Sequence, residues 1–338
     1  MAEGPEGEGR LLAGFDAGQT HTTCRLARLQ GDGQLQILGE GQGPGVSHLA
    51  ASGGKARFSE ALSASLRRAG GEAGWRPDLA AATVGASGIE QGTAVQERGA
   101  ALAAAALGLP AQRVLVTGDE RTALRGALGD RQGPGVGIVV ISGTGCIALG
   151  RNPAGREHRC GGWGWLLDRS GSACDIGRDA LALSLEMADG RRPMTPLRES
   201  LWSQLDLPAT VQDNTAEEIT AQRIKALVVD AGFGAAGFAR LAPTVDALAA
   251  AGDPEARSVL TASARGLADL VQGVARALGM EQVRVCGLGG ALTHLPCFAA
   301  AYGAELQHTL PGAEPVAARG DACDGALWLA ADALLRPR

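Results

Sequence analysis

The stretch that decides the fold is LLAGFDAGQTHTTCRLARLQGDGQLQIL, residues 11–38. It starts as a short apolar run, turns at a glycine, alternates from Thr22 to Leu29, and turns again at Gly31-Asp32-Gly33 before a third apolar segment from Leu35 to Leu38. Alternating segments joined by glycine-bearing turns are typical of antiparallel strands. The sequence therefore predicts a three-stranded meander near the start of the chain.

The same plan returns in VGIVVISGTGCIALGRNPAGREHRCGG, residues 136–162. An apolar strand meets a turn of small residues at 142–145, a second strand runs from Cys146 to Gly150, and a third follows the Asn152–Gly155 turn. Two segments with one layout indicate a supersecondary unit that is used twice.

The rest of the chain is predominantly helical in pattern. Apolar spacing and capping residues predict strands at 113–116 and 283–286, and helices at 59–69, 94–107, 120–128, 173–188, 196–204, 216–229, 237–250, 254–278, 291–301 and 325–335. Residues 1–10 are acidic and glycine-rich, so we expect a disordered tail there. The fold class is α/β, with two meander-plus-helix halves and a helical insertion in the second.

Composition narrows the function. The chain has 338 residues and a net charge of −5, which disfavours a nucleic-acid or anionic membrane surface. Its seven cysteines are scattered, so neither a disulfide framework nor a zinc site is indicated. No signal peptide and no apolar run of about 18 residues is present, so we expect a cytoplasmic protein. Glycine is the outlier, at 51 residues, about twice the usual ~7%.

Two glycine-rich turns are candidate phosphate sites. We call Asp16-Ala17-Gly18-Gln19-Thr20 the first glycine loop and Ser142-Gly143-Thr144-Gly145 the second glycine loop. Such turns direct backbone N–H groups to one concave side, where they bind anions. Asp16 adds a carboxylate for a phosphate-bound Mg²⁺, and the second loop adds two hydroxyl donors. For either loop alone, a tight hairpin without a ligand is the competing interpretation.

Two familiar nucleotide motifs do not apply. Gly143 to Ala148 matches G-x-G-x-x-A, but that fingerprint needs a helix to start there, and here the chain alternates as a strand until Asn152-Pro153. No G-x-x-x-x-G-K-[ST] occurs, and the only lysines are Lys55 and Lys225. A Rossmann site and a P-loop are therefore excluded.

Asp119 follows a predicted buried strand and precedes a helix. A carboxylate at the carboxyl end of a strand is well placed to take a proton from a substrate hydroxyl. The alternative role is to cap the helix that follows, which aspartate favours.

Two further glycine segments suit close approach of a ligand. We call Gly287-Leu288-Gly289-Gly290 the third glycine turn, which follows a strand and opens a helix, and which either admits a base or ribose or is only a tight turn. Residues 161–168, with two of the five tryptophans, we call the tryptophan bend. Indole faces and free backbone groups suit a sugar, although core aromatics in a tight bend explain the pattern slightly better when the segment is taken alone.

Together, these motifs resemble a known family. In order they are GFDAGQTHTT, VTGDERTAL, VVISGTGCIALG, RCGGWGWLLDRSGSACDIG, VRVCGLGGAL and DGALWLA. The chain resembles the N-acetylglucosamine kinase and BadF/BadG/BcrA/BcrD-type ATPase family, within the sugar kinase, heat-shock 70 and actin superfamily. The resemblance covers roughly residues 11–335.

The resemblance implies an actin-like ATPase fold of the ribonuclease H-like type, in which two duplicated domains with mixed sheets surround a nucleotide cleft. The implied domains are 11–117 and 118–323, with a helix at 324–338 that returns to the first domain. The implied activity is ATP- and Mg²⁺-dependent phosphorylation of an amino sugar, N-acetylglucosamine or a related hexosamine, by a homodimer.

The resemblance also implies roles for individual residues. Asp119 matches the catalytic base and Asp16 the metal carboxylate. The implied ATP-binding residues are Gly18, Gln19, Thr20, Ser142, Gly143, Thr144, Gly145, Gly289 and Gly290. The implied acceptor-binding residues are Ser47, His48, Ser87, Gly88, Asp119, Gly162, Trp163 and Asp168.

The chain departs from the family pattern mainly on the acceptor side. Where related kinases have G-D-E-G-S, this chain has Asp168-Arg169-Ser170-Gly171-Ser172. Arg169 therefore stands at the position of the family carboxylate that contacts the sugar. Asp168, one residue earlier, can replace that carboxylate only if the backbone shifts locally. Related kinases also have an asparagine that contacts the sugar after the first meander. In this chain other residues stand in that region, around Val46-Ser47-His48. Two alternatives to a sugar kinase remain. The family resemblance also allows an activator ATPase with an iron–sulfur cluster, and Arg169 favours a sugar or nucleotide sensor without turnover.

Overall fold

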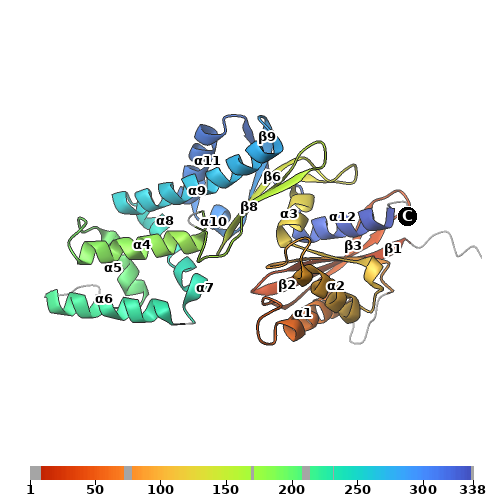
Figure 1. Ribbon diagram of the computed structural model, residues 1–338, viewed down its shortest axis with the longest axis horizontal. Coiled ribbons are helices and arrows are strands. Elements are labelled where there is room, and N and C mark those ends of the chain that lie inside the picture. The colour runs from red at the N-terminus through yellow and green to blue at the C-terminus, as the bar shows by residue number, and fades with distance from the viewer. Residues whose placement is uncertain (1–8, 72–77, 169–170, 208–213, 231, 336–338) are drawn as a thin grey trace, which may run out of the picture. The chain divides into compact units, whose positions relative to one another are not determined.

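The computed structural model describes residues 9–71, 78–168, 171–207, 214–230 and 232–335. The chain forms two compact units (Figure 1): unit 1 contains Met1–Val136 and Ala317–Arg338, and unit 2 contains Gly137–Val316. Each unit has a mixed five-stranded sheet covered by helices, as the actin-like fold class requires. Within the described ranges, no helix is both long and apolar enough to span a membrane.

The sheet of unit 1 has the order β3-β2-β1-β4-β5. Its strands are β1 (Arg10–Ala17), β2 (His21–Leu29), β3 (Leu35–Pro44), β4 (Ala81–Ala86) and β5 (Val114–Thr117). The first three are antiparallel, which confirms the first predicted meander, while β4 lies parallel between β1 and β5. The sequence analysis did not predict β4.

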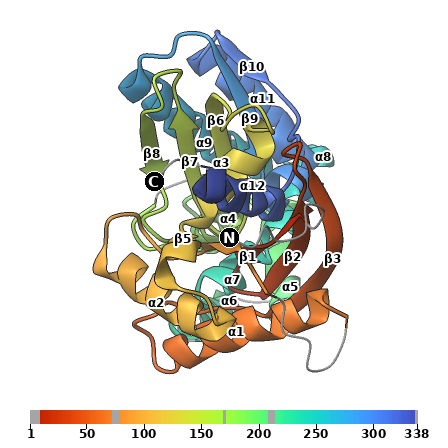
Figure 2. The same cartoon turned by 90° about the vertical axis from the view of Figure 1, so that its right-hand side faces the viewer.

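Helices cover both faces of this sheet (Figure 2). On one face, α1 (Gly54–Ala69) and α2 (Ala94–Leu107) bury a core that includes Phe15 and Phe58. On the other lie α12 (Ala322–Leu335) and α3 (Asp119–Leu128), which follows the one-turn helix η1 (Ala111–Arg113) and β5. Glycine permits close packing: a Cβ on Gly39 would lie 2.2 Å from the carbonyl oxygen of Ala69 in α1.

The closing helix α12 packs on unit 1, as the resemblance implied. It crosses α3 at two glycines: a Cβ on Gly126 would lie 1.8 Å from the Asp321 carbonyl oxygen, and one on Gly325 would lie 1.8 Å from that of Thr122. Because α3 packs against α12 and β4, it belongs to unit 1. The compact units therefore divide after Val136, whereas the sequence analysis placed the boundary after residue 117.

The sheet of unit 2 has the order β10-β9-β6-β7-β8. Its strands are β6 (Gly137–Ser142), β7 (Cys146–Arg151), β8 (Glu157–Gly161), β9 (Val283–Leu288) and β10 (Ala313–Pro315). The antiparallel β6-β7-β8 segment confirms the second predicted meander, and β9 pairs with β6 in parallel.

The helices of unit 2 are α4 (Ala173–Ala188), α5 (Pro196–Gln204), α6 (Asn214–Val229), α7 (Gly234–Ala239), α8 (Ala242–Ala250), α9 (Pro254–Leu278), α10 (Gly290–His294) and α11 (Pro296–Thr309). Asp253 caps α9, as predicted, by accepting from the N–H groups of Glu255 and Ala256. Two predicted helices are each divided in two, because Pro243 and Pro296 favour the start of a new helix.

Candidate active site

Three parallel strands of unit 1 end at one edge of its sheet. Asp16 is in register with Gly85, and Gly85 with Thr117, so Ser87 follows the end of β4, which lies beside β1, and Asp119 follows the end of β5, which lies beside β4. In open α/β sheets, ligands bind at the carboxyl ends of the strands. The structure therefore brings the candidate metal carboxylate and the candidate base to a common edge.

Asp16 lies on the face of the sheet that α12 covers. Gly14, two residues earlier on the same strand, faces that helix. A Cβ on Gly14 would lie 2.7 Å from the Cys323 carbonyl oxygen. Burial and the negative charge of Asp321 raise the pKa of Asp16, and the charge of His21 opposes them. A buried carboxylate beside another negative charge is stabilised in its charged form when a cation binds nearby.

Asp119 is the first residue of α3, and the N-cap position belongs to Gly118. Asp119 is therefore not the N-cap of α3, which was the alternative role considered from the sequence. Burial raises its pKa, the charge of Asp16 raises it further, and interactions with Glu120 oppose both. A carboxyl group whose pKa is raised in a partly buried place is suited to accept a proton from a substrate hydroxyl.

The first glycine loop joins β1 to β2. The N–H of Gly18 donates to the His21 carbonyl at 3.1 Å, and its own carbonyl accepts from Val46 N–H at 2.9 Å. Gly45 packs directly against the loop, because a Cβ on Gly45 would lie 2.0 Å from the Gln19 carbonyl oxygen. Gln19 and Thr20 are exposed at the tip, so their side chains and backbone remain accessible to a ligand.

Four of the five acceptor candidates of unit 1 gather beside this loop, and Asp119 is the fifth. Ser87 N–H donates to the Ala17 carbonyl at 3.2 Å, and Ser47 adjoins Val46, which is bonded to the loop. Gly88 has φ +77°, and a Cβ there would lie 3.3 Å from the ring of His48. The structure thus brings Ser47, His48, Ser87 and Gly88 close to the first glycine loop.

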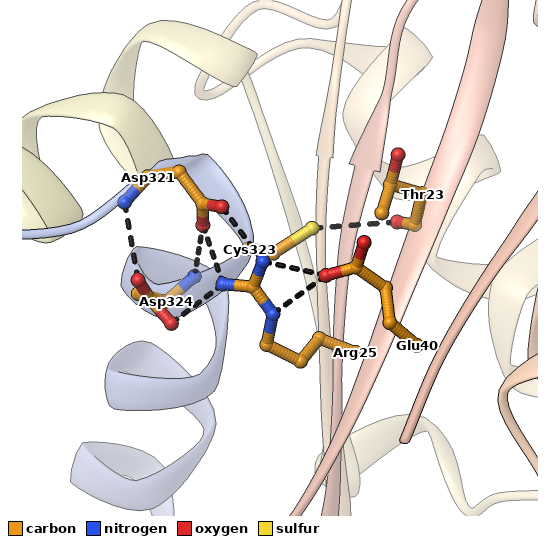
Figure 3. Close-up of polar contacts among 6 residues, drawn as sticks. All are labelled: Thr23, Arg25, Glu40, Asp321, Cys323 and Asp324. Carbon is orange, nitrogen blue, oxygen red and sulfur yellow. Dashed lines mark hydrogen bonds and ion pairs between the residues drawn. The ribbon is translucent and has the colours of Figure 1, made fainter. Parts of the chain in front are cut away.

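A charged cluster anchors the start of α12 beside this edge (Figure 3). Arg25 on β2 donates to Glu40 on β3 at 2.6 Å, to Asp321 at 2.8 Å and to Asp324 at 2.6 Å. Although burial raises the pKa of Asp321, the hydrogen bonds from Arg25 lower it overall, so this carboxylate is charged at neutral pH. Sequence analysis missed this cluster, whose only local signal is Asp-x-x-Asp at a helix start.

In unit 2, the second glycine loop joins β6 to β7. Its Gly143 N–H donates to the Gly145 carbonyl at 2.9 Å, while the Gly143 carbonyl accepts from Ala173 N–H at 2.8 Å. Thr144 and Gly145 are exposed, and no described atom lies within 4 Å of a Cβ built on either glycine. The backbone of Thr144 and Gly145 is therefore open to a phosphate, whereas the Gly143 N–H is already bonded within the loop.

Ser142 does not have the role expected for its side chain. The hydroxyl is fully buried and donates to the Gly171 carbonyl at 2.6 Å. Of the two predicted hydroxyl donors in the second glycine loop, only Thr144 is exposed. Ser142 instead fixes the loop from inside the unit.

The third glycine turn adjoins the second glycine loop. Because β9 runs parallel to β6 with Leu288 beside Ile141, both segments lie at the same edge of the sheet. Gly289 has φ +94°, and a Cβ there would lie 2.3 Å from the Ser142 carbonyl oxygen, so only glycine fits. Gly289 and Gly290 are thus brought together with the predicted phosphate residues of unit 2.

The tryptophan bend follows β8 in the same unit. Gly162 has φ +75°, Trp163 is 61% exposed, and Asp168 is bonded to the backbone of the bend. The three predicted acceptor residues of unit 2 therefore lie in one bend. Arg169 and Ser170, where the chain departs from the family pattern, lie outside the described residues.

Known proteins resemble this chain in sequence and in fold. Residues 13–329 match the family model of the BadF/BadG/BcrA/BcrD ATPase family. The chain belongs to this family. Among curated relatives, the N-acetylmuramic acid/N-acetylglucosamine kinase of Clostridium acetobutylicum is 28% identical over 220 residues, 64% of this chain and 67% of that protein. The N-acetyl-D-glucosamine kinase of Dictyostelium discoideum is 34% identical over 151 residues, 45% of this chain and 44% of that protein.

Solved structures extend the likeness to the whole chain. A candidate N-acetylglucosamine kinase from Chromobacterium violaceum is 28% identical with a TM-score of 0.69, covering 95% of this chain and 99% of that one. A ROK-family glucokinase from Streptomyces griseus, solved with glucose and AMPPNP, has a TM-score of 0.53 at 16% identity, over 95% of this chain and 98% of that one. The second likeness shows a shared sugar-kinase fold.

Proposed function

We propose that this member of the BadF/BadG/BcrA/BcrD ATPase family is an ATP-dependent kinase that phosphorylates a hydroxyl of an amino sugar, N-acetylglucosamine or a related hexosamine. The observation that carries the proposal is the pair of carboxyl groups, Asp16 and Asp119, at the carboxyl edge of one sheet. The two curated relatives and the whole-chain structural relative support the substrate class.

Each residue has a distinct role in this proposal. Asp119 accepts the proton of the acceptor hydroxyl as that oxygen attacks the γ-phosphoryl group. The exposed backbone N–H groups of the two glycine loops, at Gln19, Thr20, Thr144 and Gly145, bind the phosphates of ATP. Gly289 and Gly290 allow the adenosine to lie close to the backbone. Phosphoryl transfer requires little covalent chemistry from the protein, so positioning and charge stabilisation carry most of the rate.

The residues around Asp16 fit a magnesium ion. Within the described residues, no donor is hydrogen-bonded to the Asp16 carboxylate, and the charges of Asp119 and Asp321 lie near it. No three His, Cys, Asp or Glu side chains in those ranges are arranged to hold a metal alone. Mg²⁺ usually binds through one or two carboxylates together with substrate phosphates and water, so Asp16 would hold it jointly with ATP. When bound, the ion neutralises phosphate charge.

The two alternatives from the sequence have weaker support. An iron–sulfur activator needs converging cysteines, whereas five of the seven are buried as free thiols, with no metal-binding group among the described residues. A sensor without turnover was suggested by Arg169, whose surroundings are not described. ATP binding without phosphorylation of any hexosamine would favour the sensor.

The decisive variant is Asp119→Asn, which keeps the size of the side chain but removes the base. We expect phosphorylation to fall by about 10²–10⁴-fold, while the affinity for ATP changes little. Asp78→Asn, which removes an exposed carboxylate from the same unit, is the matched control. Near wild-type transfer by Asp119→Asn would overturn the assignment of the base.

We also propose that the chain acts in the cytoplasm as a homodimer. Its curated relatives are kinases of small sugars. Light scattering of the purified protein tests the oligomeric state, and a mass near the 34.2 kDa of one chain would contradict the dimer.

A further inference from the structure

The tryptophan bend is built on glycines in left-handed conformations. Gly161, Gly162 and Gly164 have φ values of +73°, +75° and +90°. The bend also packs tightly on β7, because a Cβ on Gly162 would lie 2.7 Å from the side chain of Ile147. Successive N–H groups in such conformations converge on a concave side and form a nest for an anion.

The nest is occupied by a carboxylate of the chain itself. Asp168 Oδ2 accepts from Trp163 N–H at 2.8 Å and from Gly164 N–H at 3.1 Å. Burial raises the pKa of Asp168, and the N–H groups of Trp163, Gly164 and Gly162 and the charge of Arg159 oppose this effect. The carboxylate is therefore bonded to the bend, which limits what it can offer to a ligand.

The bend that these two hydrogen bonds hold together displays large apolar side chains. The N–H groups of Leu167 and Asp168 donate back to the Gly164 carbonyl at 2.9 and 2.8 Å, so the bend closes on itself. Trp163, Leu166 and Leu167 are 61%, 76% and 74% exposed. The guanidinium of Arg159 lies 4.8 Å from the Trp163 ring centre and flanks one indole face.

We propose that Asp168 is a positioning residue: one carboxylate oxygen holds the tryptophan bend closed and thereby sets the Trp163 indole as a platform for the acceptor, without binding the sugar itself. This inference rests on the proposed function for its acceptor. It assigns Asp168 a different role from the substitute sugar carboxylate expected from the sequence.

Two substitutions separate positioning from direct contact. Asp168→Asn keeps one oxygen that can accept both N–H groups, whereas Asp168→Ala removes the acceptor. We expect Asp168→Ala to raise the KM for the hexosamine at least tenfold with the KM for ATP within twofold, and Asp168→Asn to stay within about threefold for both. Asp269→Ala, an exposed carboxylate on α9, is the control. Equal damage by Asn and Ala would overturn the inference, because the charge itself would then matter.

A second readout does not depend on catalysis. Acrylamide quenching of tryptophan fluorescence should change in Asp168→Ala but not in Asp168→Asn, and the change should disappear when Trp163→Phe is added. Quenching identical in Asp168→Ala and wild type would contradict a positioning role. If wild-type protein phosphorylates no hexosamine, the proposed function fails, and the quenching result alone then decides whether Asp168 holds the bend.

Discussion

At the scale of single residues, Asp119 is the proposed catalytic base, and its charge also lowers the stability of the fold. Its pKa is raised in the folded chain by burial and by Asp16, so folding favours the protonated form. The stability that this preference provides is complete below the unfolded pKa, about 3.9, and is lost as the pH rises through the raised folded value. At neutral pH the charged carboxylate therefore destabilises the fold, and each tenfold change in its acid dissociation constant corresponds to about 1.4 kcal/mol.

This sign predicts that Asp119→Asn is more stable than the wild type at pH 7. Denaturant unfolding followed between pH 4 and pH 8 should show a gain that is largest at neutral pH and shrinks towards pH 4. Asp78→Asn, at an exposed position, should show no such trend. A gain of the same size at every pH would contradict the electrostatic cause.

Also at the residue scale, Arg25 is expected to stabilise the start of α12. Arg25→Met leaves Glu40, Asp321 and Asp324 without their shared cation, and hydrogen bonds to charged groups contribute about 1.5–3 kcal/mol each when buried. Because the three carboxylates are 33–56% exposed, we expect a total loss of only about 1–2 kcal/mol.

The matched control is Arg67→Met, whose ion pair with Glu60 is exposed on both sides. It should change the free energy of unfolding by less than about 0.5 kcal/mol. In 1 M NaCl the difference between the two variants should decrease, because salt screens partly exposed charges. Equal effects of the two substitutions in urea unfolding would contradict a special role of Arg25.

At the scale of elements, the crossing of α3 and α12 depends on glycine. A helical Gly→Ala substitution normally stabilises by up to about 1 kcal/mol. Gly325→Ala should do the opposite and cost about 1–3 kcal/mol, because the new Cβ would meet the Thr122 backbone carbonyl, which cannot rotate away. Gly303→Ala in α11, with no described atom within 4 Å, is the control and should be neutral or stabilising. Thermal unfolding measures both, and a stable Gly325→Ala would show that the helices separate without cost.

Sequence patterns predicted elements well where periodicity was clear. Both meanders and the bounds of α2, α4, α5 and α9 are confirmed. Strand β4 was missed because all six of its residues are buried and most are small, so it has neither alternation nor a large apolar run. Helix breaks at Pro243 and Pro296 were also missed, although proline supplies a signal for them.

The candidate site was predictable to the extent that it depends on strand ends. Asp16 and Asp119 meet at one edge because their strands are parallel neighbours of β4. Contacts between distant parts of the sequence were not predictable. The Ser142 hydroxyl bonds a carbonyl 29 residues away, and Arg25 binds a carboxylate 296 residues away, partners that only the folded backbone brings together.

At the scale of the whole molecule, each unit carries part of the chemistry that the proposal requires. Unit 1 supplies Asp16, Asp119 and the first glycine loop, and unit 2 supplies the second glycine loop, the third glycine turn and the tryptophan bend. Both units have the same arrangement of an antiparallel meander extended by parallel strands. This duplication explains why the chain contains two similar glycine loops.

The central claim is tested most directly by measuring ADP release from Mg·ATP over a panel of hexoses and hexosamines, with mass spectrometry of the products. The account predicts release that requires a hexosamine, yields a sugar heavier by one phosphoryl group, and is lost in Asp119→Asn. ADP release that is independent of every sugar, or no phosphorylated hexosamine at saturating ATP, would contradict it.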